Sequence, residues 1–408
     1  MSKEIPFDRA TIDEIEKEFG TPFYLYDEKT FRQRAKRLNR AFGSRFDFKE
    51  FYPVKATPNA SILKLLNEEG LGLDVATMSE LLLAQRCDIQ GDDIMFSSNG
   101  TTSDDFMKIK ELDGIINLDD ISLIDTLVES TGEVPDLLSF RVNPGKLQKG
   151  NKIIGNPIES KFGLTIEQLI PAYKKALELG VTRFGIHTMV ASNVLDRGHF
   201  VETVSVLMGI LNDLYETLGI RVEFINIGGG FGLPYRPEEK ELDIEKLSQE
   251  IDDVFKDKID YRPKLYMEQG RWFAPSGFLI AKVVSKKEIY KNYLILDAGM
   301  ADLMRPGMYG AYHHITPLVD KSKYEKKMID VVGSLCENND KFGIDMNFPD
   351  LNIGDKVAIH DVGSHGRSMG FNYNGKLRPA EILLKSDGSY KLIRGRETFD
   401  DYICNMVF

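Results

Sequence analysis

The regular alternation of short β-rich runs with longer helical patterns is the feature that most limits how this chain can fold. Eight such runs follow one another, over residues 48–55, 71–76, 93–98, 114–118, 137–143, 183–189, 223–230 and 264–270. The segments between them, such as SILKLLNEEG and IEQLIPAYKKALELG, repeat apolar residues every three or four positions, which is typical of amphipathic helices. Strands that alternate with helices form parallel sheets, so the pattern predicts a (β/α)₈ barrel, with an open doubly wound sheet as the alternative.

Beyond residue 272 the pattern changes to Val- and Ile-rich runs separated by Gly, Asp and Asn turns, with little helical periodicity. This pattern predicts an all-β domain of Greek-key or β-barrel type. The stretch TPFYLYDEKT near the N-terminus has the same β character and could join that sheet. We therefore expect an N-terminal segment over 1–30 that joins the β domain, a barrel over 31–272 and the C-terminal β domain over 273–408.

Composition argues against several classes of protein. The net charge of −11 disfavours a general nucleic-acid binder, because such proteins rely on clustered Lys and Arg. No apolar run approaches the roughly 18 residues that cross a bilayer, and the charged N-terminus lacks the pattern of a signal peptide, so we expect a cytoplasmic protein without membrane contact. The three cysteines form no CxxC pair, and the adjacent His313 and His314 lack the spacing of a ligand set, so we expect neither a disulfide framework nor a metal.

Polar residues and glycines gather at the expected carboxyl ends of the barrel strands, which is where barrel enzymes carry their catalytic groups. The residues at these positions are Lys55, Asp74, Arg141, His187, Gly228, Gly229, Gly230, Glu268, Gly270 and Arg271. Because the carboxyl ends of all the strands open on one face of a barrel, we expect these residues to converge on a single mouth.

Three of these positions suggest cofactor chemistry. A lysine that ends an apolar strand is desolvated, which favours a neutral amine able to condense with an aldehyde; a solvated lysine in a loop is the alternative for Lys55. The glycine run in INIGGGFGLPY offers backbone N–H groups beside a helix start that could cradle a phosphate, or it is only a tight turn. A carboxylate buried at Glu268 needs a cation, either a protonated pyridine nitrogen or a nearby arginine.

An ordered set of motifs extends over nearly the whole chain. It consists of FYPVKATPN, GLDVATMSEL, SKFGL, IHTMVASN, NIGGGFGLPY, MEQGR, DAGMADLMRPGMYGAYHHI, VVGSLCENND, HDVGSHGRSMGFNYNGKLRPAE and KLIRGRET. With these motifs the chain resembles the diaminopimelate decarboxylases, which belong to the alanine-racemase-like, fold type III group of pyridoxal 5′-phosphate (PLP) enzymes. The resemblance implies a PLP-dependent decarboxylation of meso-diaminopimelate to L-lysine and CO₂, the last step of lysine biosynthesis.

The resemblance also implies roles for the barrel residues. It makes Lys55 the Schiff-base lysine, stacks His187 on the cofactor ring and pairs Glu268 with the pyridinium nitrogen. A glutamate suits that place because its charge keeps the nitrogen protonated. The other cofactor contacts implied are Asp74, Arg141, Arg271 and, for the phosphate, Gly228, Gly229, Gly230 and the backbone near Gly270.

The same resemblance implies a substrate clamp and a second subunit. Arg271, Arg305 and Tyr309 are expected to hold the distal carboxylate, since the arginine fork suits a carboxylate. Cys336 and Glu337 match a Cys-Glu pair that relatives supply from the second subunit, in which the cysteine helps to reprotonate Cα and the acid recognises the reacting end. We therefore expect an obligate homodimer with shared sites. Without its motif, Cys336 would be interpreted as a small buried hydrophobe.

Three positions depart from the family pattern. Where relatives read His-Ile-Gly-Ser, this chain has HTMVASN, which moves the serine contact with the phosphate to Ser192. Gln269 replaces the proline of Glu-Pro-Gly-Arg, and we expect it to loosen that turn slightly. His365 replaces the tyrosine of Gly-Ala-Tyr-Gly; we expect it to contact cofactor and substrate, with a pH dependence near neutrality that tyrosine lacks, and Tyr373 is a nearby candidate.

Alternatives to this function stay open at the level of sequence. The chain could decarboxylate another basic amino acid, such as ornithine, lysine or carboxynorspermidine, but a diamine end would need a carboxylate partner where this chain has Arg271, Arg305 and Tyr309. It could also be a non-catalytic PLP-binding homologue, although such a protein has no need of Cys336. A racemase on the same barrel fits the length and the Cys-Glu segment less well.

Overall fold

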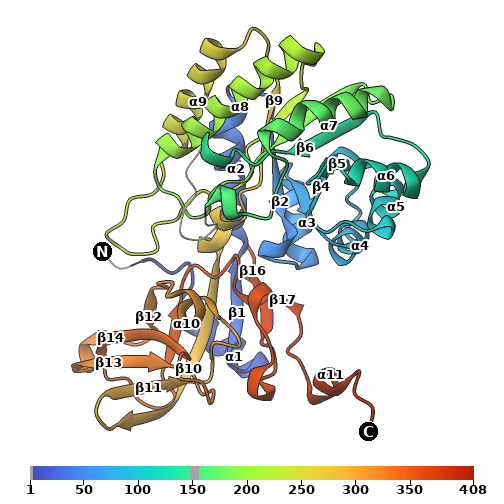
Figure 1. Cartoon of the computed structure of the whole chain (residues 1–408). Helices are drawn as coiled ribbons and strands as arrows, with labels where there is room; N and C mark the ends of the chain where they lie inside the picture. The colour runs from blue at the N-terminus through green and yellow to red at the C-terminus, as the bar shows by residue number, and fades with distance from the viewer. Residues whose placement is uncertain (1–2, 148–155) are drawn as a thin grey trace. The chain divides into compact units, whose positions relative to one another are not determined.

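The computed structural model describes residues 3–147 and 156–408 and divides into two compact units (Figure 1). The sheet unit comprises Met1–Phe31, Pro234–Glu239 and Phe273–Phe408. The barrel unit comprises Arg32–Leu233 and Lys240–Trp272. Among the helices that the structure describes, none is both long and apolar enough to cross a membrane.

Eight parallel strands close into a ring in chain order. They are β2 (Phe48–Pro53), β3 (Gly72–Val75), β4 (Ile94–Ser98), β5 (Ile115–Leu118), β6 (Leu137–Arg141), β7 (Arg183–His187), β8 (Phe224–Asn226) and β9 (Lys264–Met267). The ring closes where Phe48 of β2 pairs with Leu265 of β9. Each expected run contains one of these strands, so the predicted (β/α)₈ barrel is confirmed and the open sheet is excluded.

Helices surround this ring on the outside (Figure 1). They are α2 (Glu28–Gly43), α3 (Ala60–Glu68), α4 (Met78–Arg86), α5 (Ser103–Glu111), α6 (Leu123–Thr131), α7 (Ile166–Glu178), α8 (Arg197–Leu218) and α9 (Ile244–Lys258). Side-chain caps fix where some of them begin: at α5, Thr102 and Asp105 form a capping box. The apolar positions of IEQLIPAYKKALELG form the buried face of α7, as their spacing predicts.

Large side chains fill the interior of the ring. One cluster comprises Phe51, Met95, Ile115, Phe224 and Tyr266, in which the rings of Phe224 and Tyr266 stack with centroids 4.5 Å apart. A Cβ atom on Gly185 would lie 2.1 Å from the ring of Phe224, so only glycine fits on β7 at that point. The interior is therefore a packed core, and it holds the strands whose ends carry the polar residues.

Several strands end earlier than the sequence pattern predicts, and for the first and the seventh the structure shows why. The first stops at Pro53, which has no backbone N–H to continue the ladder, and Lys55 lies instead on the short 3₁₀ turn η1 (Val54–Ala56). The seventh stops at Asn226, because Gly228 and Gly230 have φ angles of 66° and 119°, outside the β region. The residues with functional potential thus lie on the turns that follow the strands.

The sheet unit is mostly β, which confirms the predicted β domain. Its nine-stranded sheet comprises β1 (Phe23–Asp27), β10 (Gly277–Glu288), β11 (Asn292–Leu296), β12 (Ile315–Pro317), β13 (Lys326–Val332), β14 (Lys341–Pro349), β15 (Lys356–Ile359), β16 (Ala380–Leu384) and β17 (Tyr390–Arg394). The order is β14-β13-β11-β10-β1-β16-β17, with β15 also on β10 and β12 on β15. The helices α1 (Arg9–Phe19), α10 (Arg305–Tyr309) and α11 (Phe399–Ile403) depart from a purely β unit.

Strand β1, from the TPFYLYDEKT stretch, lies inside this sheet. It pairs antiparallel with β10 and parallel with β16, and all five of its residues are buried. Ile12 and Ile15 of α1 pack into the same core as Phe23 and Leu25 of β1. The N-terminal segment from Phe7 to Leu25 therefore completes a core whose other buried members lie more than 200 residues later in the sequence.

The buried Asp302 gives the sheet unit a pH-dependent stability. One of its carboxylate oxygens accepts a hydrogen bond from the Gly299 backbone N at 2.9 Å, and Oδ1 has no hydrogen-bond partner among the described residues. Burial raises the pKa of Asp302 from 3.8 to about 6. Because the folded state holds this proton more tightly than the unfolded state, the stability that the proton supplies is lost as the pH rises from about 4 to about 6.

Asp302→Asn should therefore gain stability relative to the wild type as the pH increases. Urea unfolding at about pH 4.5 and about pH 7.5 should show the difference in unfolding free energy shift in favour of the variant by roughly 2 kcal/mol. Asparagine keeps a carbonyl oxygen that can accept from the Gly299 N–H, and any other cost of the substitution that does not depend on pH leaves the shift unchanged. A difference that stays constant between the two pH values would contradict a protonated Asp302.

Candidate active site

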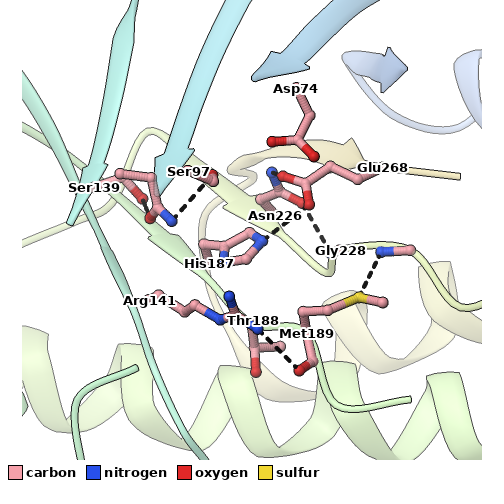
Figure 2. Close-up of polar contacts among 12 residues, drawn as sticks. Asp74, Ser97, Ser139, Arg141, His187, Thr188, Met189, Asn226, Gly228 and Glu268 are labelled. Carbon is pink, nitrogen blue, oxygen red and sulfur yellow. Dashed lines mark hydrogen bonds and ion pairs between the residues drawn. The ribbon is translucent and has the colours of Figure 1, made fainter. Parts of the chain in front are cut away.

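Four polar side chains meet at the carboxyl end of the barrel. Figure 2 shows the side chains of Asp74, His187, Asn226 and Glu268 pointing toward one another from the ends of β3, β7, β8 and β9. The first three are buried, and the Glu268 side chain is only 8% exposed. Charged groups enclosed in this way must be stabilised by one another or by a bound partner.

Glu268 is held as a carboxylate despite its burial. Its Oε2 lies 3.2 Å from His187 Nε2, and its Oε1 accepts a hydrogen bond from Asn226 Nδ2 at 2.7 Å. Burial opposes the charged form, but His187, Lys55 and Asn226 favour it and hold the pKa of Glu268 below its usual value. The site therefore contains a buried negative charge, and each carboxylate oxygen can still accept a further hydrogen bond.

The pKa of Asp74 is shifted in the opposite direction. Burial and the negative charge of Glu268 raise the pKa of Asp74 well above its usual range, although Lys55 and Arg141 oppose this rise. Its Oδ1 is buried without a hydrogen-bond partner among the described residues, and so is His187 Nδ1. Unsatisfied buried atoms on two neighbouring side chains indicate a place for a polar ligand.

Lys55 lies beside Asp74, but the expected desolvation of its side chain is wrong. Its Nζ is 3.8 Å from Asp74 Oδ2, and the side chain is 65% exposed. The apolar strand β2 ends at Pro53, so the turn that follows carries Lys55 out of the core. Its amine is therefore accessible from solvent and reaches a buried carboxyl group.

Arg141 forms another wall of the cluster. Its Nη1 lies 3.6 Å from Asp119 Oδ1, its guanidinium lies 4.5 Å from the centroid of the Phe162 ring, and its Nη2 donates to the Met189 carbonyl at 3.5 Å. The side chain is 14% exposed. A paired and stacked arginine of this kind is held in one position and adds positive charge to the mouth.

The glycine run forms a tight turn against Glu268. The helix that we expected directly after this run is absent, because the next helix in the chain begins only at Ile244. A Cβ atom on Gly229 would lie 2.2 Å from the Glu268 carbonyl oxygen. The Gly228 N–H donates to Asn226 Oδ1 at 2.8 Å, so Asn226 contacts both the glycine run and Glu268. The glycines thus bring backbone N–H groups close to the buried carboxylate without the help of a helix dipole.

Met189, which follows β7, packs against this turn, as Figure 2 shows. Its Sδ accepts a hydrogen bond from the Gly229 N–H at 3.1 Å. A thioether is a weak acceptor on a flexible side chain, so a stronger acceptor can displace it from this N–H.

Gln269 tightens the turn rather than loosening it, so that expectation is wrong. It is 1% exposed, its Oε1 accepts from the Phe231 N–H at 3.0 Å, and its Nε2 donates to the Gly228 carbonyl at 3.2 Å. Its backbone N–H donates to Oε1 of Glu50. Sequence reasoning missed these contacts because a side-chain bridge between two turns has no local pattern.

Arg271 and Ser192 meet at the same mouth. Arg271 Nη2 donates to Ser192 Oγ at 3.2 Å. A Cβ atom on the neighbouring Gly270 would lie 2.6 Å from Pro53 Cγ, so the turn after β9 packs closely on the turn that leads to Lys55. The structure therefore brings all the barrel residues singled out in the sequence to one end of the ring.

The other predicted site residues belong to the sheet unit. Arg305, at the start of α10, is buried; its Nη1 donates to Tyr235 Oη and to His313 Nε2, both at 3.0 Å. His313 Nδ1 lies 2.8 Å from the His360 carbonyl oxygen, which can only accept, so the Nδ1 carries the proton and Nε2 is the acceptor for Arg305. Tyr309 ends α10 and is 64% exposed.

Cys336 and Glu337 lie in the loop between β13 and β14. Cys336 is exposed, which excludes a buried structural thiol, and its backbone N–H donates to Asn374 Oδ1 at 2.9 Å. Asp340 closes the loop by accepting from the Leu335 N–H at 2.8 Å. The loop is thus braced from both sides while its thiol remains accessible.

His365 and Tyr373 lie in the long connection between β15 and β16. His365 is half-buried with a φ of 56°, a backbone conformation uncommon for residues other than glycine, and Tyr373 is 50% exposed. Within the described part of the chain, no group of three or more His, Cys, Asp and Glu side chains is arranged to hold a metal ion.

Two residues of the barrel cluster escaped the sequence reasoning. Asn226 directly precedes the glycine run, and a polar residue at that strand end was a usable signal. Glu50 is a fully buried acid inside an apolar strand, where burial raises its pKa well above the usual range. An acid within the run FKEFYP was the only sign of it.

Comparison with known proteins places this site in a family. Residues 28–275 match the model described as the pyridoxal-dependent decarboxylase, pyridoxal binding domain. Protein TabA of Pseudomonas amygdali pv. tabaci is 39% identical over 96% of this chain and 92% of its own. The diaminopimelate decarboxylase of Methanothermobacter thermautotrophicus is 36% identical, again over 96% and 92%. The crystal structure of diaminopimelate decarboxylase from M. jannaschii in co-complex with L-lysine superposes with a TM-score of 0.91 at 33% identity, covering 100% of this chain and 98% of that one.

These matches span both units and therefore concern the whole chain rather than a shared barrel alone. The match to the family model covers the entire barrel unit, including the turns that carry Lys55, the glycine run and Glu268. The chain belongs to the pyridoxal-dependent decarboxylase family, and within it to the group that contains the diaminopimelate decarboxylases.

Proposed function

We propose that this protein decarboxylates meso-diaminopimelate to L-lysine and CO₂ with PLP as its cofactor. The observation that carries the proposal is the full-length similarity to diaminopimelate decarboxylases, one of them solved with L-lysine bound. The geometry agrees with it, because a buried carboxylate held in its charged form is what a protonated pyridine nitrogen requires.

The barrel mouth fits PLP at each of its polar ends. Glu268 supplies the charge for the pyridine nitrogen, and the exposed amine of Lys55 is accessible to the aldehyde. Gly229 and Gly230 would hold the phosphate through their backbone N–H groups, once the phosphate displaces the sulfur of Met189 from the Gly229 N–H. The unsatisfied atoms Asp74 Oδ1 and His187 Nδ1 support a polar ligand in the same place.

When bound, the cofactor accepts the electron density that remains on Cα as CO₂ departs. Glu268 keeps the pyridine nitrogen protonated, since removing that proton would leave a buried negative charge without its cation. Asn226 and His187 orient the two oxygens of Glu268 for this task. The thiol of Cys336 would then return a proton to Cα, and its exposure on the loop suits a group that must reach a substrate.

Arg305 is the residue we propose for the distal carboxylate. The neutral His313 fixes one of its nitrogens, which leaves the rest of the guanidinium fork in a defined orientation. A buried arginine favours a substrate with a carboxylate, because the distal ammonium group of a diamine would bring a second positive charge next to the guanidinium. Tyr309 and Arg271 complete the proposed contacts.

Release of CO₂ from purified, PLP-loaded protein tests the substrate. The protein is offered meso-diaminopimelate, L-lysine, D-lysine, L-ornithine and D-ornithine in parallel. Preference for meso-diaminopimelate with L-lysine as product supports the proposal. Preference for a substrate without the distal carboxylate, unaffected by Arg305→Met, would show that the role of Arg305 is wrong, and no turnover of any of the five would favour a non-catalytic homologue.

We also propose a homodimer in which Cys336 and Glu337 serve the site of the partner subunit. Lys55→Ala and Cys336→Ala chains should each be nearly inactive alone. Unfolding and refolding them together should restore about a quarter of the wild-type activity, because half of the dimers then contain one intact site of two. If each site used residues of one chain, every site in the mixture would keep one substitution, and no activity would return.

A further inference from the structure

Both the oxygen and the nitrogen of the Gln269 side-chain amide bind backbone groups at the ends of the glycine run. Its Oε1 accepts from the Phe231 N–H at 3.0 Å and its Nε2 donates to the Gly228 carbonyl at 3.2 Å. These two backbone groups flank Gly229 and Gly230, whose N–H groups we assign to the phosphate. Gln269 therefore joins the two ends of the segment 228–231.

Gln269 is itself held from the opposite side. Its backbone N–H donates to Oε1 of Glu50, which is fully buried on β2, 219 residues away in the sequence. A proline at position 269 has no N–H and no polar side chain, so it can make none of these three contacts. Glu50 and Gln269 thus form a connection from the barrel wall to the glycine run that a Glu-Pro-Gly-Arg sequence does not provide.

We propose that Gln269 is a positioning residue for the phosphate of the cofactor: it fixes both ends of the glycine segment so that the N–H groups of Gly229 and Gly230 stay aligned. Glycines lose more backbone freedom than other residues when a ligand orders them. The glycine run has no helix directly after it that would restrain its backbone, since the next helix begins only at Ile244. Restraining the segment in advance reduces that entropic cost of binding. The inference rests on the proposed placement of the phosphate at these glycines.

Gln269→Met tests this role, because methionine keeps the length and volume of the side chain but forms neither hydrogen bond. Titrations should compare PLP with pyridoxal, which lacks the phosphate. We expect the variant to weaken PLP binding about tenfold and to leave pyridoxal binding within about twofold. Gln168→Met is the matched control, because Gln168 Oε1 also accepts from a backbone N–H, that of Thr165 at 2.9 Å, but at the start of α7. It should change neither affinity. An equal loss for both ligands, or no loss for either, overturns the role of Gln269.

The amide signals of Gly229 and Gly230 separate this inference from the phosphate placement. The run at 228–230 contains the only adjacent glycines in the sequence, so labelling glycine with ¹³C at its carbonyl and ¹⁵N at its amide selects these two amides in carbonyl-filtered NMR spectra. In the wild type they should shift with PLP and much less with pyridoxal. If both ligands shift them alike, the phosphate placement fails and the inference with it. If only PLP shifts them but Gln269→Met leaves the ratio of affinities unchanged, the inference alone is overturned.

Discussion

Replacing Lys55 by alanine should abolish decarboxylation and covalent retention of the cofactor. The expected loss of activity is at least about a thousandfold, because the amine that attacks the aldehyde has no substitute at that position. Borohydride reduction followed by mass spectrometry should place PLP on the Lys55 peptide in the wild type and on no peptide in the variant. The amine can reach the cofactor because its side chain is 65% exposed at the barrel mouth.

Lys64→Ala is the matched control for this experiment. Lys64 lies on α3, the helix that follows the Lys55 turn, and pairs with the exposed Asp88 at 3.2 Å. Its loss should leave activity and labelling unchanged. A Lys55→Ala protein with wild-type activity would exclude the proposed mechanism, whereas one that is labelled at another lysine would show that a different amine binds the cofactor.

Replacing Glu268 by glutamine should lower kcat/KM by about 10²- to 10³-fold while Lys55 still binds the cofactor. This range is typical when one group that stabilises developing charge in a buried site is removed. Glutamine nearly matches the shape of glutamate and can keep a contact with Asn226, but it carries no charge to hold the pyridine proton. The expected decrease in kcat/KM therefore comes from the lost charge and not from changed packing.

The pH profile gives the same test an independent readout. Because the pKa of Glu268 lies below its usual value, the wild-type carboxylate stays charged from neutral pH down to the folded pKa, and its stabilising effect is lost only as the pH falls through that value. Glu268→Gln should therefore remain impaired at every pH above about 5. Glu223→Gln changes the same side chain at the opposite, amino-terminal side of β8 and should leave kcat/KM within about twofold. Equal kinetics of Glu268→Gln and the wild type would contradict the role of the charge.

Sequence periodicity predicted the architecture because it depends on local rules. Each of the eight runs contains a strand of the ring, since alternating strands and helices can bury their apolar faces in few other ways. The strand ends also identified Lys55, Asp74, Arg141, His187 and Glu268, because parallel strands deliver their carboxyl ends to one side. The motifs predicted the family for a further reason, since several of them occur together in a fixed order.

Contacts between distant segments could not be predicted in this way. The desolvation expected for Lys55 was wrong because Pro53 ends the strand before it. The loosening expected at Gln269 was wrong because its partners lie 38, 41 and 219 positions away. The helix expected beside the glycine run is also missing, because a glycine-rich turn fixes the backbone but not the element that follows it.

The amino-acid sequence by itself determined the barrel, the mostly β second unit and the set of residues at the barrel mouth, because hydrophobic spacing and strand direction are properties of neighbouring residues. The tertiary structure alone decided the lowered pKa of Glu268, the raised pKa values of Asp74 and Asp302, and the restraint of the glycine run by Gln269 and Glu50. These properties depend on burial and on charges brought together from separate strands, and both exist only after the chain has folded.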